Sequence, residues 1–458
     1  MDFLTTGLII FTFLILLVLT SNYLFIVYYQ DPSDSYLLSN IVTVVTLSTT
    51  LICVLLIPID ILLTSGSIQG IGELSNTDTK QALIYILILM VLLAFVFIPF
   101  TYFYIEEVFD EFDSDEKTFC NKFCKASQYT AFTLIICILL SVVGLSIRPT
   151  NKEWGQGKEW IRQLFDLESG GEAAISYTVA CLTVVGGGFW SLYTSYGMGV
   201  LPSLLIWGRK SSKDHIRELD LGLSEIEEKI KEIELKSSKN KKKDSVEKVK
   251  LVKEQKKMLK KSEKLKNNRE NWGLQVLFKI LLPFKITIGV VFAILGVIFM
   301  VSLLIGSVNR LMHSECGYKC GFMTEKNLLI NPLDYFLVQA SKWFPLDYFL
   351  FITIFLYKYI ASLYALVSIG VRLLCILVRN IQIFPIKAKK TLPQGLLLAS
   401  IIIMLIFLGI AMEILTVLPI YSTFGFQQVE ENGEIKTCSF ENYGKSCNMS
   451  NISQLFNK

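Results

Sequence analysis

Residues 392–420 read LPQGLLLASIIIMLIFLGIAMEILTVLPI, and Glu413 is their only charged side chain. The hydrocarbon core of a bilayer is about 30 Å thick, and roughly 20 apolar residues in a helix cross it. The apolar content would also suit a buried strand. At this length a helix is favoured, because a helix satisfies its own backbone hydrogen bonds in lipid. The stretch therefore predicts a transmembrane helix.

Seven other stretches have the same character. Of the 458 residues, 52% are hydrophobic and 18% are charged, and the mean hydropathy is +0.50, which excludes an ordinary soluble domain. The predicted fold class is all-α, a polytopic helical membrane protein with about eight transmembrane helices. We expect them at residues 4–29, 37–64, 82–105, 128–147, 174–206, 280–306, 347–378 and 393–420. The first has Asp2 in place of a basic n-region, so we interpret it as a retained span.

Lysine-rich segments predict the orientation. The polar insertion 208–272 contains KNKKK and KEQKKMLKK, and the positive-inside rule places it in the cytosol. Alternation then puts RNIQIFPIKAKK, residues 379–390, on the same side. The amino terminus and the loops 65–81, 148–173 and 307–346 are expected in the lumen. The predicted domains are thus a membrane part at 1–207, the insertion, a membrane part at 273–420 and a lumenal tail at 421–458.

The insertion itself predicts a helical hairpin. Its apolar residues recur at helical spacing in two stripes separated by KSSKNKKKD. These are Leu223, Ile226, Ile230 and Ile233 in the first stripe, and Val249, Val252, Leu259 and Leu265 in the second. We interpret the hairpin as a docking arm for another protein; the alternative is contact of its lysines with anionic membrane lipid. Nucleic acid is not expected as a partner.

The tail and one loop carry features typical of a lumenal compartment. NMSNIS, residues 448–453, contains two overlapping N-glycosylation acceptors, Asn448 and Asn451. Two cysteine pairs are expected in an oxidising lumen and could form disulfides, although sequence does not fix their connectivity. They are Cys316 and Cys320 in the loop, and Cys438 and Cys447 in the tail.

Signatures of an enzyme are absent from the sequence. The two histidines, His215 and His313, lie outside any HExxH motif, and there is no GxxxxGK[ST] phosphate loop. We therefore predict a protein that is not an enzyme, without a covalently bound cofactor or a metal. Cys120 and Cys124 in CNKFC are interpreted as plain thiols, with palmitoylation or metal binding as alternatives.

Glycines in the fifth stretch point to close helix packing rather than to nucleotide binding. The sequence GGGFW, residues 186–190, lies within an expected span, and Gly197 and Gly199 follow along the same helix. Small residues of this kind let helices approach closely.

The phrase PLDYF occurs twice, at residues 332–336 and 345–349. Proline suits the first helical position, and an aspartate in the first turn lies beside the positive end of the helix dipole. Both copies therefore predict helix starts, the second at the mouth of the seventh span. The functional alternative is that Asp334 and Asp347 line a lumenal vestibule.

Three charged residues are expected inside the membrane, where charges are rare and usually paired. Lys358 lies about eleven residues into the seventh span and Glu413 about seven into the eighth, each from the lumenal end, so both lie about 10–16 Å deep. They can form an ion pair lining a polar cavity, with Asp60 as a third member. The alternatives are a snorkelling Lys358 and a protonated or backbone-bonded Glu413.

Several motifs together resemble the limb-region and lipocalin-receptor-like membrane protein family. They are IPIDILLTS (57–65), IPFTYFYIEE (98–107), LYTSYGMGVLPSLLIWGRKS (192–211), FPLDYFLFITI (344–354) and LPQGLLLAS (392–400). The resemblance implies a multi-pass lysosomal membrane protein required for cobalamin (vitamin B12) to leave the lysosome. It also implies a lysosomal ABC-type ATPase as partner and cobalamin as the transported ligand.

The resemblance leaves two points open. The family implies a ninth span and a cytosolic sorting tail beyond the point where the 458 residues end; a shortened form, an incomplete gene model or loss of the last span in this lineage would each account for this. It also implies an alternative function, that of an endocytic receptor for a lipocalin-like protein. Short lumenal segments favour transport over the receptor.

Overall fold

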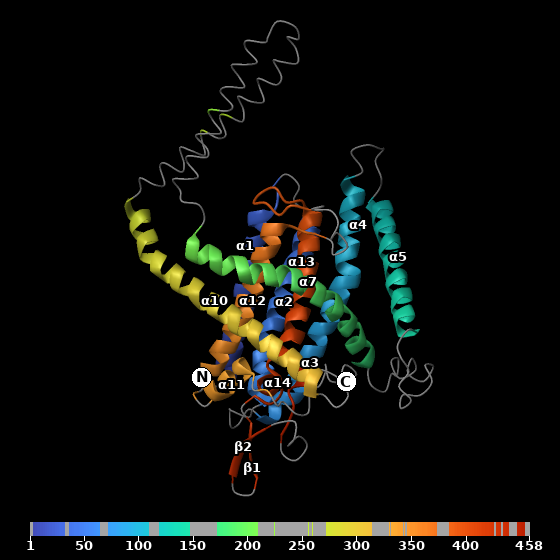
Figure 1. The fold of residues 1–458 in the computed structure, drawn as a ribbon. Coiled ribbons are helices and arrows are strands. Elements are labelled where there is room, and N and C mark those ends of the chain that lie inside the picture. The colour runs from blue at the N-terminus through green and yellow to red at the C-terminus, as the bar shows by residue number, and fades with distance from the viewer. Residues whose placement is uncertain are drawn as a thin grey trace, which may run out of the picture. The chain divides into compact units, whose positions relative to one another are not determined.

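The computed structural model describes most of the membrane part of the chain (Figure 1). The described residues are 3–32, 36–64, 72–109, 119–146, 172–208, 224, 255, 259, 272–313, 329, 331–341, 343, 346–372, 384–425, 427–431, 434–438 and 447–453. They form two compact units, one made of residues 1–198 and 295–458 and the other of residues 199–294. The predicted hairpin within 208–272 lies outside the described residues, apart from isolated positions.

Each of the eight predicted apolar stretches contains a helix. The long helices are α1 (Phe3–Tyr29), α2 (Leu37–Thr64), α3 (Gly72–Leu92), α4 (Ile98–Phe109), α5 (Phe119–Ser146), α7 (Glu172–Trp207), α10 (Trp272–His313), α12 (Leu346–Ile369) and α13 (Pro393–Val417). A π-helical segment, η1 (Leu93–Phe97), joins α3 to α4, so these two form one continuous rod. There are also two short helices: α11 (Pro332–Ala340) precedes α12 in the sequence, and α14 (Pro419–Phe424) follows α13.

Five helical segments are long and apolar enough to cross a membrane among the residues described. They are Leu37–Ile61, Thr79–Val108, Pro283–Asn309, Leu346–Ile369 and Pro393–Val417. The chain is therefore a polytopic helical membrane protein. Both PLDYF phrases start helices as predicted, the first at Pro332 in α11 and the second at Leu346 in α12.

Two details differ from the expected fold. The seventh span was expected to reach residue 378, but α12 ends at Ile369, because Gly370 adopts a positive φ of 77° and Val371 then pairs with Phe384. The fold class was expected to be all-α, but the tail includes strands. It contains an antiparallel hairpin of β1 (Gln428–Glu431) and β2 (Glu434–Thr437), in which Gln428 lies opposite Thr437.

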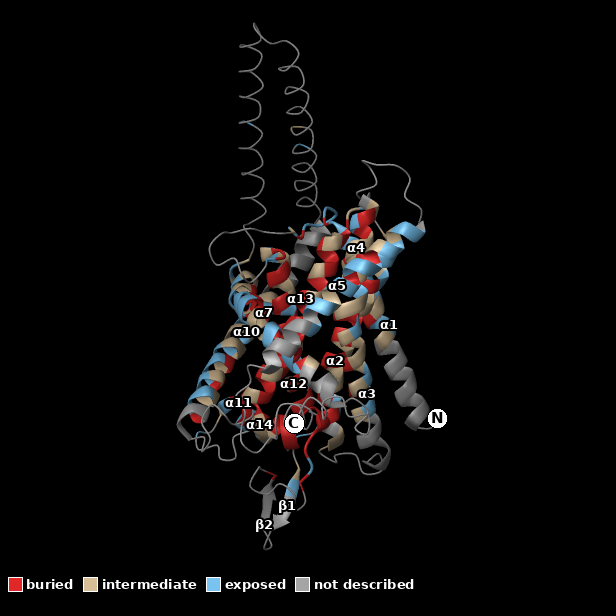
Figure 2. Cartoon of the chain, turned by 90° about the vertical axis from the view of Figure 1, so that its right-hand side faces the viewer, coloured by how far each residue is buried: buried red, intermediate tan, exposed pale blue. Residues whose placement is uncertain are grey.

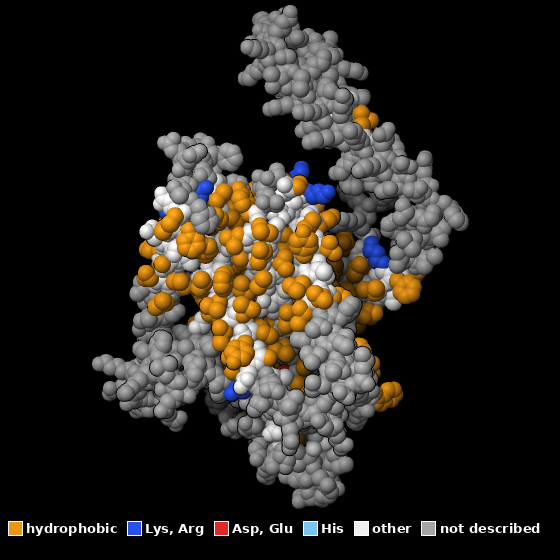
Figure 3. All heavy atoms as spheres, turned by 180° about the vertical axis from the view of Figure 1, so that it is seen from behind, with side chains coloured by type: hydrophobic (Ala, Val, Ile, Leu, Met, Phe, Trp, Pro, Cys, Tyr) orange, Lys and Arg blue, Asp and Glu red, His pale blue; other side chains and the backbone are white. Residues whose placement is uncertain are grey.

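The core of the first unit is built around α13. Nearly all of its residues are buried, and α2 and α12 pack against it (Figure 2). The outer helices instead expose apolar side chains, as on α5 and α10, where Phe132 and Val297 are mostly exposed. Figure 3 shows one such apolar face, with basic side chains at its margins. An apolar exterior around a packed interior is what a bilayer solvent requires.

The connections of the first unit gather at two opposite ends (Figures 1 and 2). We call the end with α11, α14, β1 and β2 the tail end. The other end carries the α1–α2 connection and the loop 384–392, and we call it the loop end. This grouping matches the alternation expected from the sequence for these segments.

Candidate functional site

The candidate site is an ion pair between two inner helices. Lys358 on α12 and Glu413 on α13 meet with 2.5 Å between Nζ and Oε2. Both residues are buried, with 1% and 8% of their surface exposed. The Lys358 Nζ also lies 3.0 Å from the centre of the Phe299 ring of α10, within cation–π range. The structure thus brings together the two residues that the sequence placed at equal depth, and Lys358 does not snorkel.

Pairing makes these charges tolerable in an apolar interior. An isolated charge would lose its hydration, whereas a contacting opposite charge and an aromatic face replace part of it. The indole nitrogen of Trp190 on α7 is also buried and interacts with the side chain of Glu413. A polar centre therefore lies within a core that is otherwise apolar.

Helix α7 holds α12 in place beside the ion pair. The hydroxyls of Thr194 and Ser362 are 2.8 Å apart, and Ser362 Oγ also donates to the carbonyl oxygen of Lys358. The Tyr357 hydroxyl donates to the carbonyl oxygen of Met198 at 3.3 Å. These bonds fix the face of α12 that carries the lysine.

Two of the predicted glycines allow this approach. A Cβ atom on Gly197 would overlap the carbonyl oxygen of Ala361, and one on Gly186 would overlap that of Leu405. Gly186 also packs against Gly409 of α13. By contrast, a Cβ on Gly187 or Gly199 would meet no atom of the described residues within 4 Å.

Asp60 does not join the ion pair, which corrects the expectation of a third member. It lies on α2, is buried, and accepts two hydrogen bonds from the tail. Asn451 Nδ2 donates to Oδ1 at 2.8 Å, and the Ile452 N–H donates to Oδ2 at 3.0 Å. Asp60 therefore anchors the tail to α2.

Asp334 and Asp347 do not line an open vestibule, because both are buried against α14. The Asp334 carboxylate accepts the N–H groups of Ile420 and Tyr421 and so caps the start of α14. Asp347 Oδ2 accepts the Tyr421 hydroxyl at 2.9 Å, and its Oδ1 is buried without a hydrogen-bond partner among the described residues. Burial raises the pKa of Tyr421, which keeps its hydroxyl protonated as the donor.

Burial also raises the pKa of Asp334 to about 7, against the two N–H donors that favour its charged form. In the unfolded chain this carboxyl is expected to release its proton near the ordinary value of 3.8. Unfolding between these two values therefore releases a proton, so the free energy of unfolding falls as pH rises through this window.

We expect the wild-type protein to lose up to about 1.4 kcal/mol of stability per pH unit within this window, relative to the Asp334→Asn variant. Denaturant unfolding of both purified proteins across the window measures the difference. A difference that stays constant, or that rises with pH, would contradict a raised Asp334 pKa.

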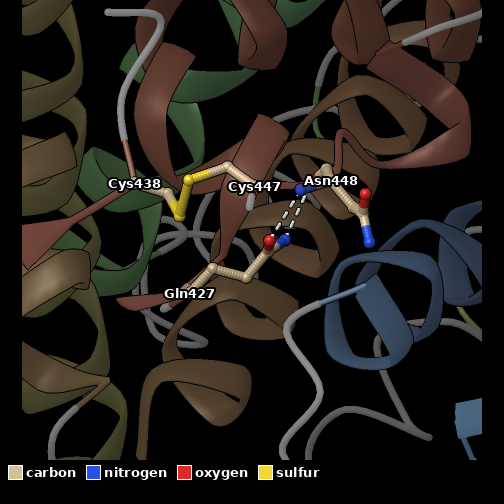
Figure 4. Close-up of a disulfide and its surroundings, with 4 residues drawn as sticks. All are labelled: Gln427, Cys438, Cys447 and Asn448. Carbon is tan, nitrogen blue, oxygen red and sulfur yellow. Dashed lines mark hydrogen bonds between the residues drawn. A yellow bond between two sulfur atoms is a disulfide. The ribbon is translucent and has the colours of Figure 1, made fainter. Parts of the chain in front are cut away.

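The tail end is closed by a disulfide (Figure 4). Cys438 and Cys447 are bonded, with 5.9 Å between their Cα atoms, so of the alternative connectivities the structure has the one within the tail. Gln427 exchanges two hydrogen bonds with the backbone of Asn448, while the Asn448 side chain points away from them. Cys316 and Cys320 lie outside the described residues.

The two predicted glycosylation acceptors differ in access. Asn448 is exposed, whereas Asn451 is 5% exposed and its Nδ2 is held by Asp60 and by Thr79 Oγ1. A glycan on Asn451 would have to replace these hydrogen bonds and displace the packing around them. The structure therefore favours Asn448 alone.

Several residues of the tail end were not found from the sequence. Asn331 caps α11 through Oδ1 and also ties α13 to α11, because its Nδ2 donates to the carbonyl oxygen of Val417 at 2.7 Å. An asparagine before PLDYF is a helix-cap signal that was available. The role of Tyr421 as donor to Asp347 had no signal, since the two are 74 residues apart.

Other side-chain clusters offer no further site in the part of the chain that is described. No group of three His, Cys, Asp or Glu residues there could hold a metal ion. A small cavity between α2, α3 and α13 is lined by apolar side chains such as Leu83 and Phe407, with Ile452 of the tail at its edge. Nothing in this cavity would orient a polar ligand.

Comparison with known proteins places the chain in a family. The model of the LMBR1-like membrane protein family matches residues 7–278, more than half of the chain. The protein belongs to the LMBR1-like membrane protein family. No solved structure matches it.

Curated members of this family resemble the chain over most of its length. A probable lysosomal cobalamin transporter of Dictyostelium discoideum is 31% identical, with 98% of this chain and 89% of that protein aligned. One of Aspergillus clavatus is 30% identical, with 88% and 75% aligned. The lysosomal cobalamin transport escort protein LMBD1 of Gallus gallus is 29% identical, with 93% and 80% aligned. The resemblance noted from the motifs is thereby confirmed at the level of the family.

Proposed function

We propose that this protein serves the export of cobalamin from the lysosome to the cytosol, as a transporter or as an escort, and that it is not an enzyme. The observation that carries the proposal is the alignment of nearly the whole chain with a relative named as a probable lysosomal cobalamin transporter. A polytopic helical fold with a buried polar centre is compatible with either role.

Deletion of the gene in its own organism tests this function. Cobalamin should accumulate in lysosomes and fall in the cytosol, and re-expression of the chain should restore both. Unchanged cobalamin distribution would reject the proposal. If uptake of a lipocalin-like protein were lost instead, the receptor function would replace it.

An ABC-type ATPase of the lysosome is the proposed partner. The sequence has no phosphate-binding loop, so an active export step needs the nucleotide-binding domain of another protein. One escort protein among the relatives is named for a role that implies a companion. The insertion 208–272 is the proposed docking arm.

We expect the ABC-type ATPase to co-purify with the full chain and to be lost when residues 214–270 are replaced by a flexible linker. The first compact unit, residues 1–198 and 295–458, does not include the insertion, so the variant should still fold. Folded yield of the membrane part is the control. Undiminished co-purification would assign the contact to the membrane helices.

The proposed orientation has eight spans, with the amino terminus and the tail end in the lumen. Its support is the lysine-rich composition of the insertion and of residues 379–390. A disulfide in the tail is compatible with an oxidising compartment.

Glycosylation distinguishes this orientation from its inverse. Asn448→Gln should abolish a mass loss on glycosidase treatment, whereas Asn451→Gln should leave the glycan in place and lower stability by removing the bonds to Asp60 and Thr79. A protease added to intact lysosomes should cut within residues 236–245 and spare the tail. Tail cleavage from the cytosolic side would invert the orientation.

A further inference from the structure

A short basic turn closes the loop end of the first unit. It comprises Lys387–Thr391, and its three lysines, Lys387, Lys389 and Lys390, are all exposed. Among the residues that the structure describes, no carboxylate lies within ion-pair distance of these three side chains. Three positive charges are therefore concentrated in four consecutive positions without compensation by described residues.

The basic turn is fixed to the end of α1 by backbone hydrogen bonds. The N–H of Lys389 donates to the carbonyl oxygen of Tyr28 at 3.2 Å, and that of Thr391 donates to Tyr29 at 3.2 Å. The N–H of Asp31 donates back to the carbonyl oxygen of Thr391 at 3.1 Å. Asp31 is thus an acidic residue that is joined to the turn through its own backbone N–H.

Thr391 closes the basic turn from inside. Its buried hydroxyl donates to the carbonyl oxygen of Lys387 at 2.8 Å and accepts the N–H of the same residue at 3.0 Å. The N–H of Lys390 also donates to the carbonyl oxygen of Lys387. The lysines consequently project from a fixed backbone rather than from a free linker.

Lys389 adopts a left-handed conformation, with φ of 57°, and it is the one described residue other than glycine with a positive φ. Glycine or asparagine adopts this conformation more readily than lysine does. A lysine here has a conformational cost, and its exposed side chain recovers none of it through a described contact. Its charge is the property left to offset that cost.

The basic turn lies at the expected depth of lipid headgroups. Helix α13, which crosses the apolar layer, begins at Pro393, only two residues after the turn. Tyr28 and Leu392 beside it are exposed apolar or amphipathic side chains that suit the membrane interface. Preformed basic groups at this depth attract phosphorylated lipid headgroups.

We propose that the basic turn binds the phosphorylated headgroup of an anionic lipid in the adjacent leaflet. This goes beyond cobalamin export, and only the assignment of that leaflet to the cytosol rests on the orientation proposed above. The lysines supply charge-assisted N–H donors to the phosphate. The left-handed backbone conformation at Lys389 sets the directions in which the lysine side chains leave the turn.

Titration of the purified full chain in neutral detergent with a dye-labelled, short-chain phosphatidylinositol phosphate tests the proposal. Replacing all three lysines with glutamine should weaken binding about a hundredfold, at about fivefold per lysine. Lys389→Gly should weaken it about fivefold while thermal stability is kept or raised, whereas Lys389→Arg should bind like the wild type. Thr391→Val should weaken binding without any change of charge.

The matched control removes three lysines elsewhere, as Lys152→Gln, Lys158→Gln and Lys326→Gln in the loops 148–173 and 307–346, and should bind like the wild type. An equal loss in that control would assign binding to net charge and overturn the site. Unchanged affinity of the variant lacking the three turn lysines would overturn it as well. Equal binding of short-chain phosphatidylserine, or of the soluble inositol phosphate alone, would reject the phosphorylated lipid as ligand.

Discussion

Replacing Lys358 with methionine should destabilise the protein by about 3–5 kcal/mol, because it leaves the Glu413 carboxylate buried without its partner. Glu413→Gln alone should also be destabilising, since it strands the ammonium group against Phe299. The double variant carries no charge at either position. It should therefore cost less than the sum of the two single changes, with a coupling energy of about 1–3 kcal/mol.

Denaturant unfolding of the two single variants and the double variant in detergent measures this coupling. Lys285→Met on α10 is the matched control, because Lys285 forms no ion pair with a described residue and lies only partly buried; its effect should stay within about 0.5 kcal/mol. Strictly additive losses would show that Lys358 and Glu413 do not interact energetically.

The same variants separate a structural role from a transport role. If the double variant recovers stability but fails to restore cobalamin export in the deletion strain, the charges take part in transport. If it recovers both, the pair only fixes the packing of α12 on α13. Because Lys358 also contacts Phe299 of α10, the ion pair is a candidate for coupling the movements of α10, α12 and α13 during a conformational change.

Length and hydropathy were sufficient to predict the helices, because lipid imposes a minimum run of apolar residues that is visible in one dimension. The depth of a side chain within the membrane could also be predicted from the sequence. Lys358 and Glu413 were placed together by counting residues from one membrane surface, and the structure has them in contact. The end of α12 was missed because Gly370 stops the helix inside an apolar run, and hydropathy alone does not register a change in φ.

The residues that lie beside a given side chain on neighbouring helices could not be predicted by counting residues along the sequence. Asp60 looked like a partner for the ion pair because it lies in a span, but it bonds to Asn451, which is 391 residues away. The vestibule alternative put Asp334 at the lumenal surface. The neighbour that buries it, α14, comes 86 residues later. Which helices are neighbours depends on how closely their surfaces pack. A glycine in the sequence indicates a neighbouring helix only if the backbone of that helix approaches it closely.

Gly186→Ala and Gly197→Ala should each destabilise the protein by more than about 2 kcal/mol, although alanine is the better helix former. At both positions the new methyl group would overlap a backbone carbonyl of the facing helix, that of Leu405 or of Ala361. A backbone atom cannot rotate away as a side chain can. The helices would have to separate.

Gly187→Ala and Gly199→Ala are the matched controls on the same helix. No described atom lies within 4 Å of the added Cβ, so these changes should be neutral or stabilising by up to about 1 kcal/mol. Thermal unfolding of the four variants under one set of conditions provides the comparison. Equal losses at all four positions would show that the close approach of α7 to α12 and α13 does not set stability.

Gly197 connects this packing to the ion pair. Ala361, which it touches, lies between Lys358 and Ser362 on α12, and Ser362 bonds to both the Lys358 backbone and Thr194. Moving α7 outward should break the Thr194–Ser362 bond and loosen the face of α12 that presents the lysine. In the Gly197→Ala background, Lys358→Met should therefore cost less than it does in the wild type, whereas in the Gly199→Ala background its cost should be unchanged.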